Sequence, residues 1–127
     1  MNRPGLQQSI IIFALVALSL SACGAHAPDP EAAQKYHGEG MWYLTTVMTE
    51  RDPEKAVEWF TKAIHADPGF VKSYNARGVA YVLLGEYEKA SADFEDALLL
   101  DPSYDPALEN LLHLNRGEYD QVLAVEF

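Results

Sequence analysis

The chain has 127 residues, a single cysteine and a formal net charge of −10, and 49% of its residues are hydrophobic. This length suits one small domain, and the acidic balance repels phosphate backbones, so we expect no nucleic-acid partner. A lone cysteine excludes an intrachain disulfide, so the fold must be stabilised by packing alone.

The first 23 residues contain the parts of a secretory signal. Arg3 and the amino terminus supply positive charge, residues 10–20 are apolar, and Ser21 and Ala22 are small residues in front of Cys23. The apolar run is shorter than the about 20 residues that a membrane-spanning helix needs. An ordinary signal peptide with a chance cysteine and an uncleaved anchor are the alternatives.

The sequence Leu20-Ser21-Ala22-Cys23 resembles the lipobox of bacterial lipoproteins. The resemblance implies that residues 1–22 are removed as a signal peptide and that Cys23 becomes the first residue, anchored in a membrane by acyl chains such as palmitate. Cleavage removes Arg3 and no acidic residue, which leaves a net charge of −11. Residues 23–30 are small, polar and interrupted by proline, which indicates a tether with a reach of roughly 25 Å.

The remainder, residues 31–127, is expected to be helical and repetitive. We predict helices over 31–50, 53–66, 70–83, 87–100, 105–115 and 118–126. Two units share their spacing of aromatic, glycine and alanine residues, and each closes with Asp-Pro. The matching positions are Tyr36, Gly40 and Tyr43 with Tyr74, Gly78 and Tyr81; Glu54-Lys55-Ala56 with Glu88-Lys89-Ala90; and Phe60, Ala63 and Ile64 with Phe94, Ala97 and Leu98.

This spacing resembles the tetratricopeptide repeat, a helix–turn–helix unit of about 34 residues. The resemblance implies an all-α fold, a short solenoid of antiparallel helix pairs with repeats near 33–70 and 71–104 and a partial unit at 105–127. Gly78 and Ala90 are small where paired helices approach, Gly85 suits a left-handed helix end, and the Asp-Pro pairs separate helices. Arrays usually need three repeats for stability, so self-association into a homo-oligomer is a hypothesis.

Three departures from the repeat pattern affect the predicted packing. About four extra residues near 45–50 lengthen the first helix, Val122 replaces the alanine of the earlier units, and Glu126 replaces their phenylalanine. The last unit is therefore expected to act as a cap, because the terminal units of a solenoid lack a neighbour on one face.

The sequence lacks the motifs that usually accompany catalysis. It contains no GxSxG, HExxH, CxxC or phosphate-binding GxxxxGK[ST] pattern. The four histidines form no i,i+4 pair, so we expect no metal site. We therefore expect a protein that is not an enzyme and needs no cofactor.

Tetratricopeptide arrays bind peptides along the concave face that the first helix of each unit lines. Carrying that pattern over gives a predicted groove for a protein or peptide partner. The first unit contributes Gln34, His37, Met41, Leu44 and Thr45, the second Lys72, Asn75, Val79, Val82 and Leu83, and the third Glu109 and His113. The alternative is that the short array buries these side chains itself. Met41 and Val79 stand where family members that bind chaperone tails carry asparagine. Trp42 is expected either to cover the open end of the first unit or to touch lipid or a partner.

The resulting hypothesis is a lipid-anchored adaptor or scaffold in a bacterial envelope assembly, such as a pilus or secretion system, an outer-membrane assembly complex or a cell-wall complex. Gly24 follows Cys23; an aspartate there would favour the inner membrane, so we expect the outer membrane, facing the periplasm. The alternatives are a non-catalytic modulator of a cell-wall enzyme and a self-assembling structural protein. Two repeats bury little area, so partner affinity is expected to be about micromolar.

Overall fold

The computed structural model of the protein describes residues 26–45 and 51–122. Over these residues the chain forms five α-helices and one 3-10 helix: α2 (Pro30–Thr45), α3 (Pro53–Ala66), α4 (Val71–Leu83), α5 (Tyr87–Leu100), α6 (Asp105–Arg116) and η1 (Tyr119–Gln121). In this part of the chain no helix is long and apolar enough to cross a membrane. The predicted signal peptide, Cys23, the extension of the first helix to residue 50 and Glu126 lie outside the described residues.

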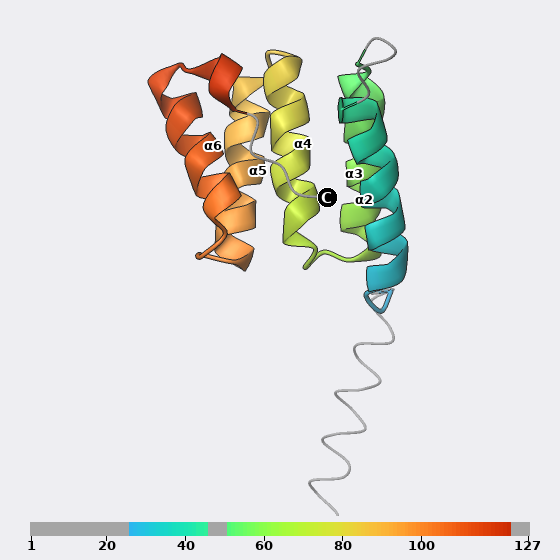
Figure 1. The fold of residues 1–127 in the computed structure, drawn as a ribbon. Helices are drawn as coiled ribbons and strands as arrows, with labels where there is room; N and C mark the ends of the chain where they lie inside the picture. Colours follow the sequence, from blue (N-terminus) through green and yellow to red (C-terminus); the bar gives the residue numbers. More distant parts are fainter. Residues whose placement is uncertain (1–25, 46–50, 123–127) are drawn as a thin grey trace, which may run out of the picture.

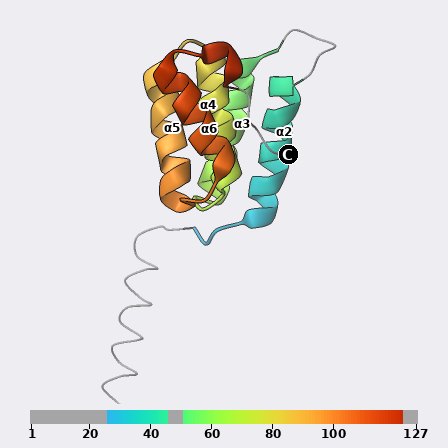
Figure 2. The ribbon, with the colours of Figure 1, turned by 60° about the vertical axis from the view of Figure 1, so that its left-hand side comes forward.

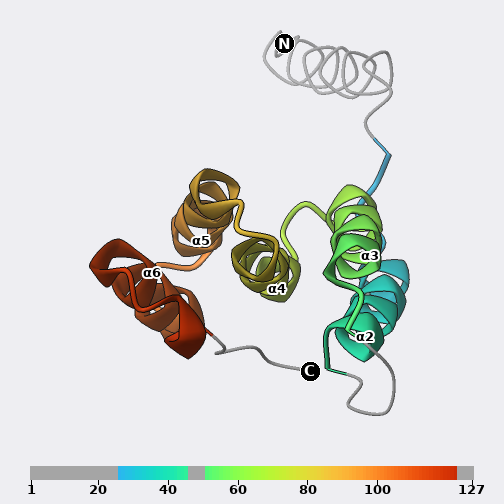
Figure 3. The same cartoon turned by 90° about the horizontal axis from the view of Figure 1, so that it is seen from above.

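The helices stand side by side in an antiparallel series, as two turned views show (Figures 1 and 2). Seen along the helix axes, α2, α4 and α6 line the inner side of a shallow arch, and α3 and α5 lie on its outer side (Figure 3). The predicted all-α stack of helix pairs is thereby confirmed.

Aspartate side chains start the first two helices. The Asp29 carboxylate accepts the backbone N–H of Ala32 at 2.9 Å in the first turn of α2, and the Asp52 carboxylate accepts that of Lys55 at 3.0 Å in the first turn of α3. Proline follows each aspartate and suits the first helical position, because its missing N–H has no helical partner there. The local sequence thus sets where both helices begin.

The Asp-Pro pairs at the ends of the two units terminate helices, as predicted. Asp67 and Asp101 follow α3 and α5 with extended backbone. Their carboxylates accept the N–H of Gly69 at 2.9 Å and of Ser103 at 3.0 Å, which folds the next residues into a turn. Each turn brings the following helix back along the stack.

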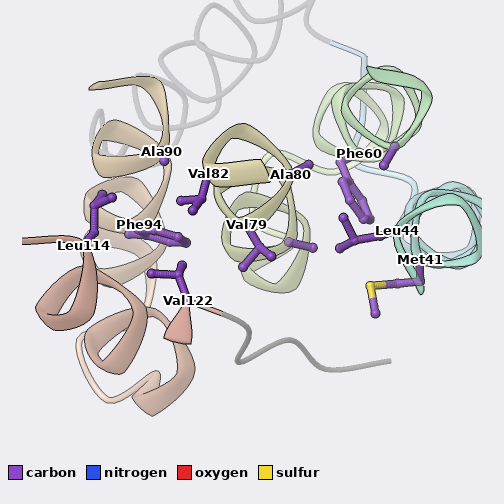
Figure 4. Close-up of a cluster of buried hydrophobic side chains, with 12 residues drawn as sticks. Met41, Leu44, Phe60, Val79, Ala80, Val82, Ala90, Phe94, Leu114 and Val122 are labelled. Carbon is purple, nitrogen blue, oxygen red and sulfur yellow. The ribbon is translucent and has the colours of Figure 1, made fainter. Parts of the chain in front are cut away.

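An aromatic ring packed on a glycine joins the two helices of each complete pair. A Cβ added to Gly40 of α2 would lie 2.5 Å from Phe60 Cε1 of α3, and one added to Gly78 of α4 would lie 2.5 Å from Phe94 Cε1 of α5. Both phenylalanines are fully buried, and Figure 4 shows them between neighbouring helices. The predicted close approach at Gly78 is confirmed, and the same contact occurs at Gly40.

Two glycines have different backbone conformations, so alanine is expected to change the free energy of unfolding in opposite directions at the two positions. Gly38 is exposed inside α2 with no atom near its missing Cβ, whereas Gly85 has φ of 74° after α4. Gly38→Ala is expected to raise the free energy of unfolding by about 0.5–1 kcal/mol, because alanine favours a helix interior. Gly85→Ala is expected to lower it by about 1–2 kcal/mol, because a Cβ disfavours left-handed backbone. Urea unfolding followed by circular dichroism measures both, and effects of the same sign would contradict the assignment.

The predicted helix over 118–126 is wrong for residues 118–122. Only the three-residue helix η1 forms there. Short isolated helices are marginal, and two side-chain contacts hold this segment instead. Tyr119 stacks on Tyr87 with ring centroids 4.0 Å apart, and Val122, 1% exposed, joins the core cluster that contains Phe94 (Figure 4).

Candidate functional site: the inner strip of the arch

The predicted groove residues come from two helices, α2 and α4, that run in the same direction on the inner side of the arch (Figure 3). Lys72 is half-buried and Leu83 is 40% exposed. The other six are buried: His37, Met41, Leu44, Asn75, Val79 and Val82. The fold itself therefore buries these six side chains, which is the alternative that the sequence alone kept open.

The apolar members of the strip belong to one core cluster. Met41 and Leu44 of α2 and Val79 and Val82 of α4 share this cluster with both core phenylalanines and Val122 (Figure 4). A partner that uses these four side chains needs them to become exposed first. Binding through them stays a prediction, and the exposed margin of the strip is the part available without rearrangement.

The polar members of the strip link consecutive inner helices. His37 Nδ1 of α2 shares a buried hydrogen bond of 3.1 Å with Ser73 Oγ of α4, and Asn110 Nδ2 of α6 donates to Asn75 Oδ1 of α4 at 2.9 Å. The His37 ring also packs on Phe60 and Phe70, each with a centroid distance of 5.4 Å. Buried polar groups require such partners, so these residues hold the arch together. The sequence alone did not identify Ser73 as a residue that links two units. The one signal of that role is its position on the first helix of a unit, on the side that faces the preceding unit.

Two exposed apolar side chains lie near the carboxyl ends of the inner helices α2 and α4. Trp42, 55% exposed, is near the carboxyl end of α2, and Leu83 ends α4. The Trp42 ring meets the Tyr43 ring edge-on, with centroids 4.9 Å apart. Since α2 and α4 are parallel, both side chains lie toward the same end of the arch. Leu83 is the exposed apolar side chain of the predicted groove at this end.

A buried ion pair connects three successive helices. Arg77 of α4 donates from Nε and Nη2 to the two carboxylate oxygens of Asp93 on α5, both at 2.8 Å, and from Nη1 to Thr61 Oγ1 of α3 at 3.1 Å. Burial raises the pKa of the Asp93 carboxyl, and the hydrogen bonds from Arg77 offset part of that rise. Because all the charge is satisfied within the core, this cluster has a structural role.

Within the described residues, no group of three or more histidine, cysteine, aspartate or glutamate side chains is arranged to hold a metal ion. His37, the groove histidine of α2, is enclosed by Phe60, Phe70 and Ser73. The packing contacts and hydrogen bonds of the inner strip are therefore made between the inner helices themselves.

Comparison with known proteins agrees with this reading of the fold. Residues 71–104 match the sequence profile of the tetratricopeptide repeat, and these residues are the pair α4 and α5 with the turn that follows. The chain is thus a short tetratricopeptide-repeat solenoid, and it carries a module of the protein–protein interaction class.

The relatives that match are longer proteins. A UDP-N-acetylglucosamine–peptide N-acetylglucosaminyltransferase of Giardia intestinalis is 30% identical over 87 residues, 68% of this chain and 6% of that protein. The Aspergillus fumigatus heat-shock protein cognate (HSC) co-chaperone sgt12 is 33% identical over 87 residues, 68% of this chain and 24% of that protein. The mouse FK506-binding protein-like protein is 29% identical over 104 residues, 67% of this chain and 30% of that protein. The chain spans less than a third of each of these relatives.

Proposed function

We propose that this chain is a lipid-anchored adaptor that recruits a protein partner to an assembly of the bacterial envelope, facing the periplasm from the outer membrane. The observation that carries the proposal is the sequence Leu20-Ser21-Ala22-Cys23 placed just ahead of an interaction module. The lipid on Cys23 supplies attachment, and the solenoid supplies recognition.

The way the tether joins the domain supports this arrangement. The backbone N–H of Asp29 donates to the carbonyl of Ala66 at 2.8 Å, which ties the start of α2 to the end of α3. Trp42 follows Pro30 along α2 by about 18 Å at 1.5 Å per residue. Trp42 and Leu83 therefore lie toward the end of the arch opposite Pro30, where a partner has access.

A chaperone-tail adaptor is not part of the proposal, although one relative is named as a co-chaperone. Met41 and Val79 are apolar and buried at the positions where family members that bind chaperone tails carry asparagine. Asn110 is bonded to Asn75 in the inner strip. Two positions that would contact a carboxylate terminus in such relatives are therefore apolar in this chain.

The test of anchoring is metabolic labelling with an alkyne analogue of palmitate in a bacterial host that expresses the full chain. The wild type is expected to take up the label and to begin at Cys23 in mass spectra, whereas Cys23→Ser takes up none and keeps residues 1–22. The matched control Cys23→Ser/Ala25→Cys moves the thiol by two residues and is expected to remain unlabelled. Absence of label from the wild type, or label on either variant, would refute lipidation at Cys23.

A further inference from the structure

One face of α6 is an apolar surface that the described chain leaves uncovered. Leu108 and Leu112 are 45% and 46% exposed. They line a shallow hollow of about 350 Å³, and its remaining lining comes from the same helix: Asp105, Glu109, His113 and Arg116. These six positions recur every three or four residues, so they form one stripe along α6.

The repeat register shows what this stripe is built to contact. Leu108 and Leu112 lie one 34-residue period after Tyr74 and Gly78 of α4. On α4 these two residues face α5: Tyr74 packs with Ala97 and Leu98, and Phe94 packs on Gly78. In the part of the chain that the structure describes, α5 and η1 pack on other faces of α6, and no helix covers Leu108 and Leu112. The stripe is thus a helix-pairing face that has no helix on it, and Leu112 in place of glycine excludes the close aromatic contact of the earlier pairs.

The charges on the stripe indicate its occupant. Asp105 lies in the first turn of α6 and Arg116 in the last, and both are exposed. A second copy of α6 running antiparallel across a two-fold axis would bring Leu108 onto the partner's Leu112. It would also bring Asp105 beside the partner's Arg116 at both ends, because the spacing between the charges is the same in each copy. A parallel pairing would instead set like charges against each other.

We propose that this chain forms a two-fold dimer through α6, with Leu108 and Leu112 at its centre and an Asp105–Arg116 ion pair at each end. The interface is small and the chain carries a net charge of −10. We therefore expect a weak dimer, with a dissociation constant of about 10–100 μM. Such a dimer leaves Trp42 and Leu83 accessible, so it adds to partner binding and does not replace it.

The test is sedimentation equilibrium of the full chain in a density-matched mild detergent, with thermal melting of each variant in parallel. Leu112→Glu is expected to weaken dimerisation at least about tenfold, because it buries a carboxylate at the centre. The matched control Leu99→Glu changes a leucine of α5 that is 82% exposed and outside the stripe, and is expected to leave the dimer unchanged.

Charge reversal distinguishes this register from any other interface. Asp105→Arg and Arg116→Asp alone are each expected to weaken the dimer about tenfold, and the double variant to return within about threefold of wild type. Both reversals oppose the α6 dipole, so an effect on helix stability alone would make the double variant the worst. A monomer at all concentrations up to about 1 mM, a dimer insensitive to Leu112→Glu, or a double variant that does not recover would each overturn the proposal.

Discussion

Replacing Phe94 by alanine is expected to lower the free energy of unfolding by about 3–5 kcal/mol, a large part of the roughly 5–15 kcal/mol that stabilises a domain of this kind. The ring is fully buried and belongs to the core cluster that includes Val79, Val82 and Val122. Its removal leaves a cavity between α4 and α5 that surrounding helices fill only in part. Chemical unfolding followed by circular dichroism measures the loss.

The contact of Phe94 with Gly78 predicts that Gly78→Ala changes the free energy of unfolding in opposite directions with and without the Phe94 ring. Gly78→Ala alone is expected to cost about 1–3 kcal/mol, since the new Cβ would meet the ring at 2.5 Å. In the Phe94→Ala background the same substitution is expected to stabilise by about 1 kcal/mol, because the methyl group enters the vacated space and alanine favours the helix. Additive effects of the two substitutions would contradict the ring-on-glycine packing.

Replacing Asp93 by alanine is expected to cost about 3–5 kcal/mol, because it removes the charge partner of a largely buried arginine. Arg77 would keep only its hydrogen bond to Thr61 among the contacts that its guanidinium makes to α3 and α5. The double variant Arg77→Met/Asp93→Leu is expected to lie within about 1–2 kcal/mol of wild type, since apolar side chains of similar volume need no charge partner. Unfolding curves of the three proteins settle the comparison. A double variant as unstable as Asp93→Ala would show that the packing of these positions, and not their charge, holds the three helices together.

The repeat pattern predicts the helix pairs well because it records contacts made inside each pair. A glycine on the first helix and a phenylalanine on the second recur in both units, as Gly40 with Phe60 and as Gly78 with Phe94. Each of these contacts marks the closest approach of its two helices. The helix starts follow from local chemistry, an aspartate cap before proline, which needs no knowledge of the rest of the fold. These features are properties of neighbouring residues or of one repeat.

Contacts that occur in one unit only were harder to predict, because no repeated spacing records them. The Arg77–Asp93 pair has no counterpart in the first unit, where Glu39 and Trp59 stand at the matching positions. Whether the groove side chains Met41 and Val79 face solvent depends on the curvature of the arch and on what packs beside α4, and no spacing encodes either. Residues 118–122 follow the residue pattern of the earlier units, but the contacts of Tyr119 and Val122 determine their structure.

The most direct test of the adaptor proposal is photo-crosslinking in bacterial cells from a benzoylphenylalanine at Leu83, with Cys23 intact. Leu83 is the exposed apolar residue of the predicted groove, so the probe disturbs no core contact and samples the inner margin. A probe at Glu95, exposed on the outer helix α5, is the matched control. The account predicts one dominant envelope protein captured from Leu83 and not from Glu95. Adducts confined to this chain, or the same proteins captured from both positions, would contradict it.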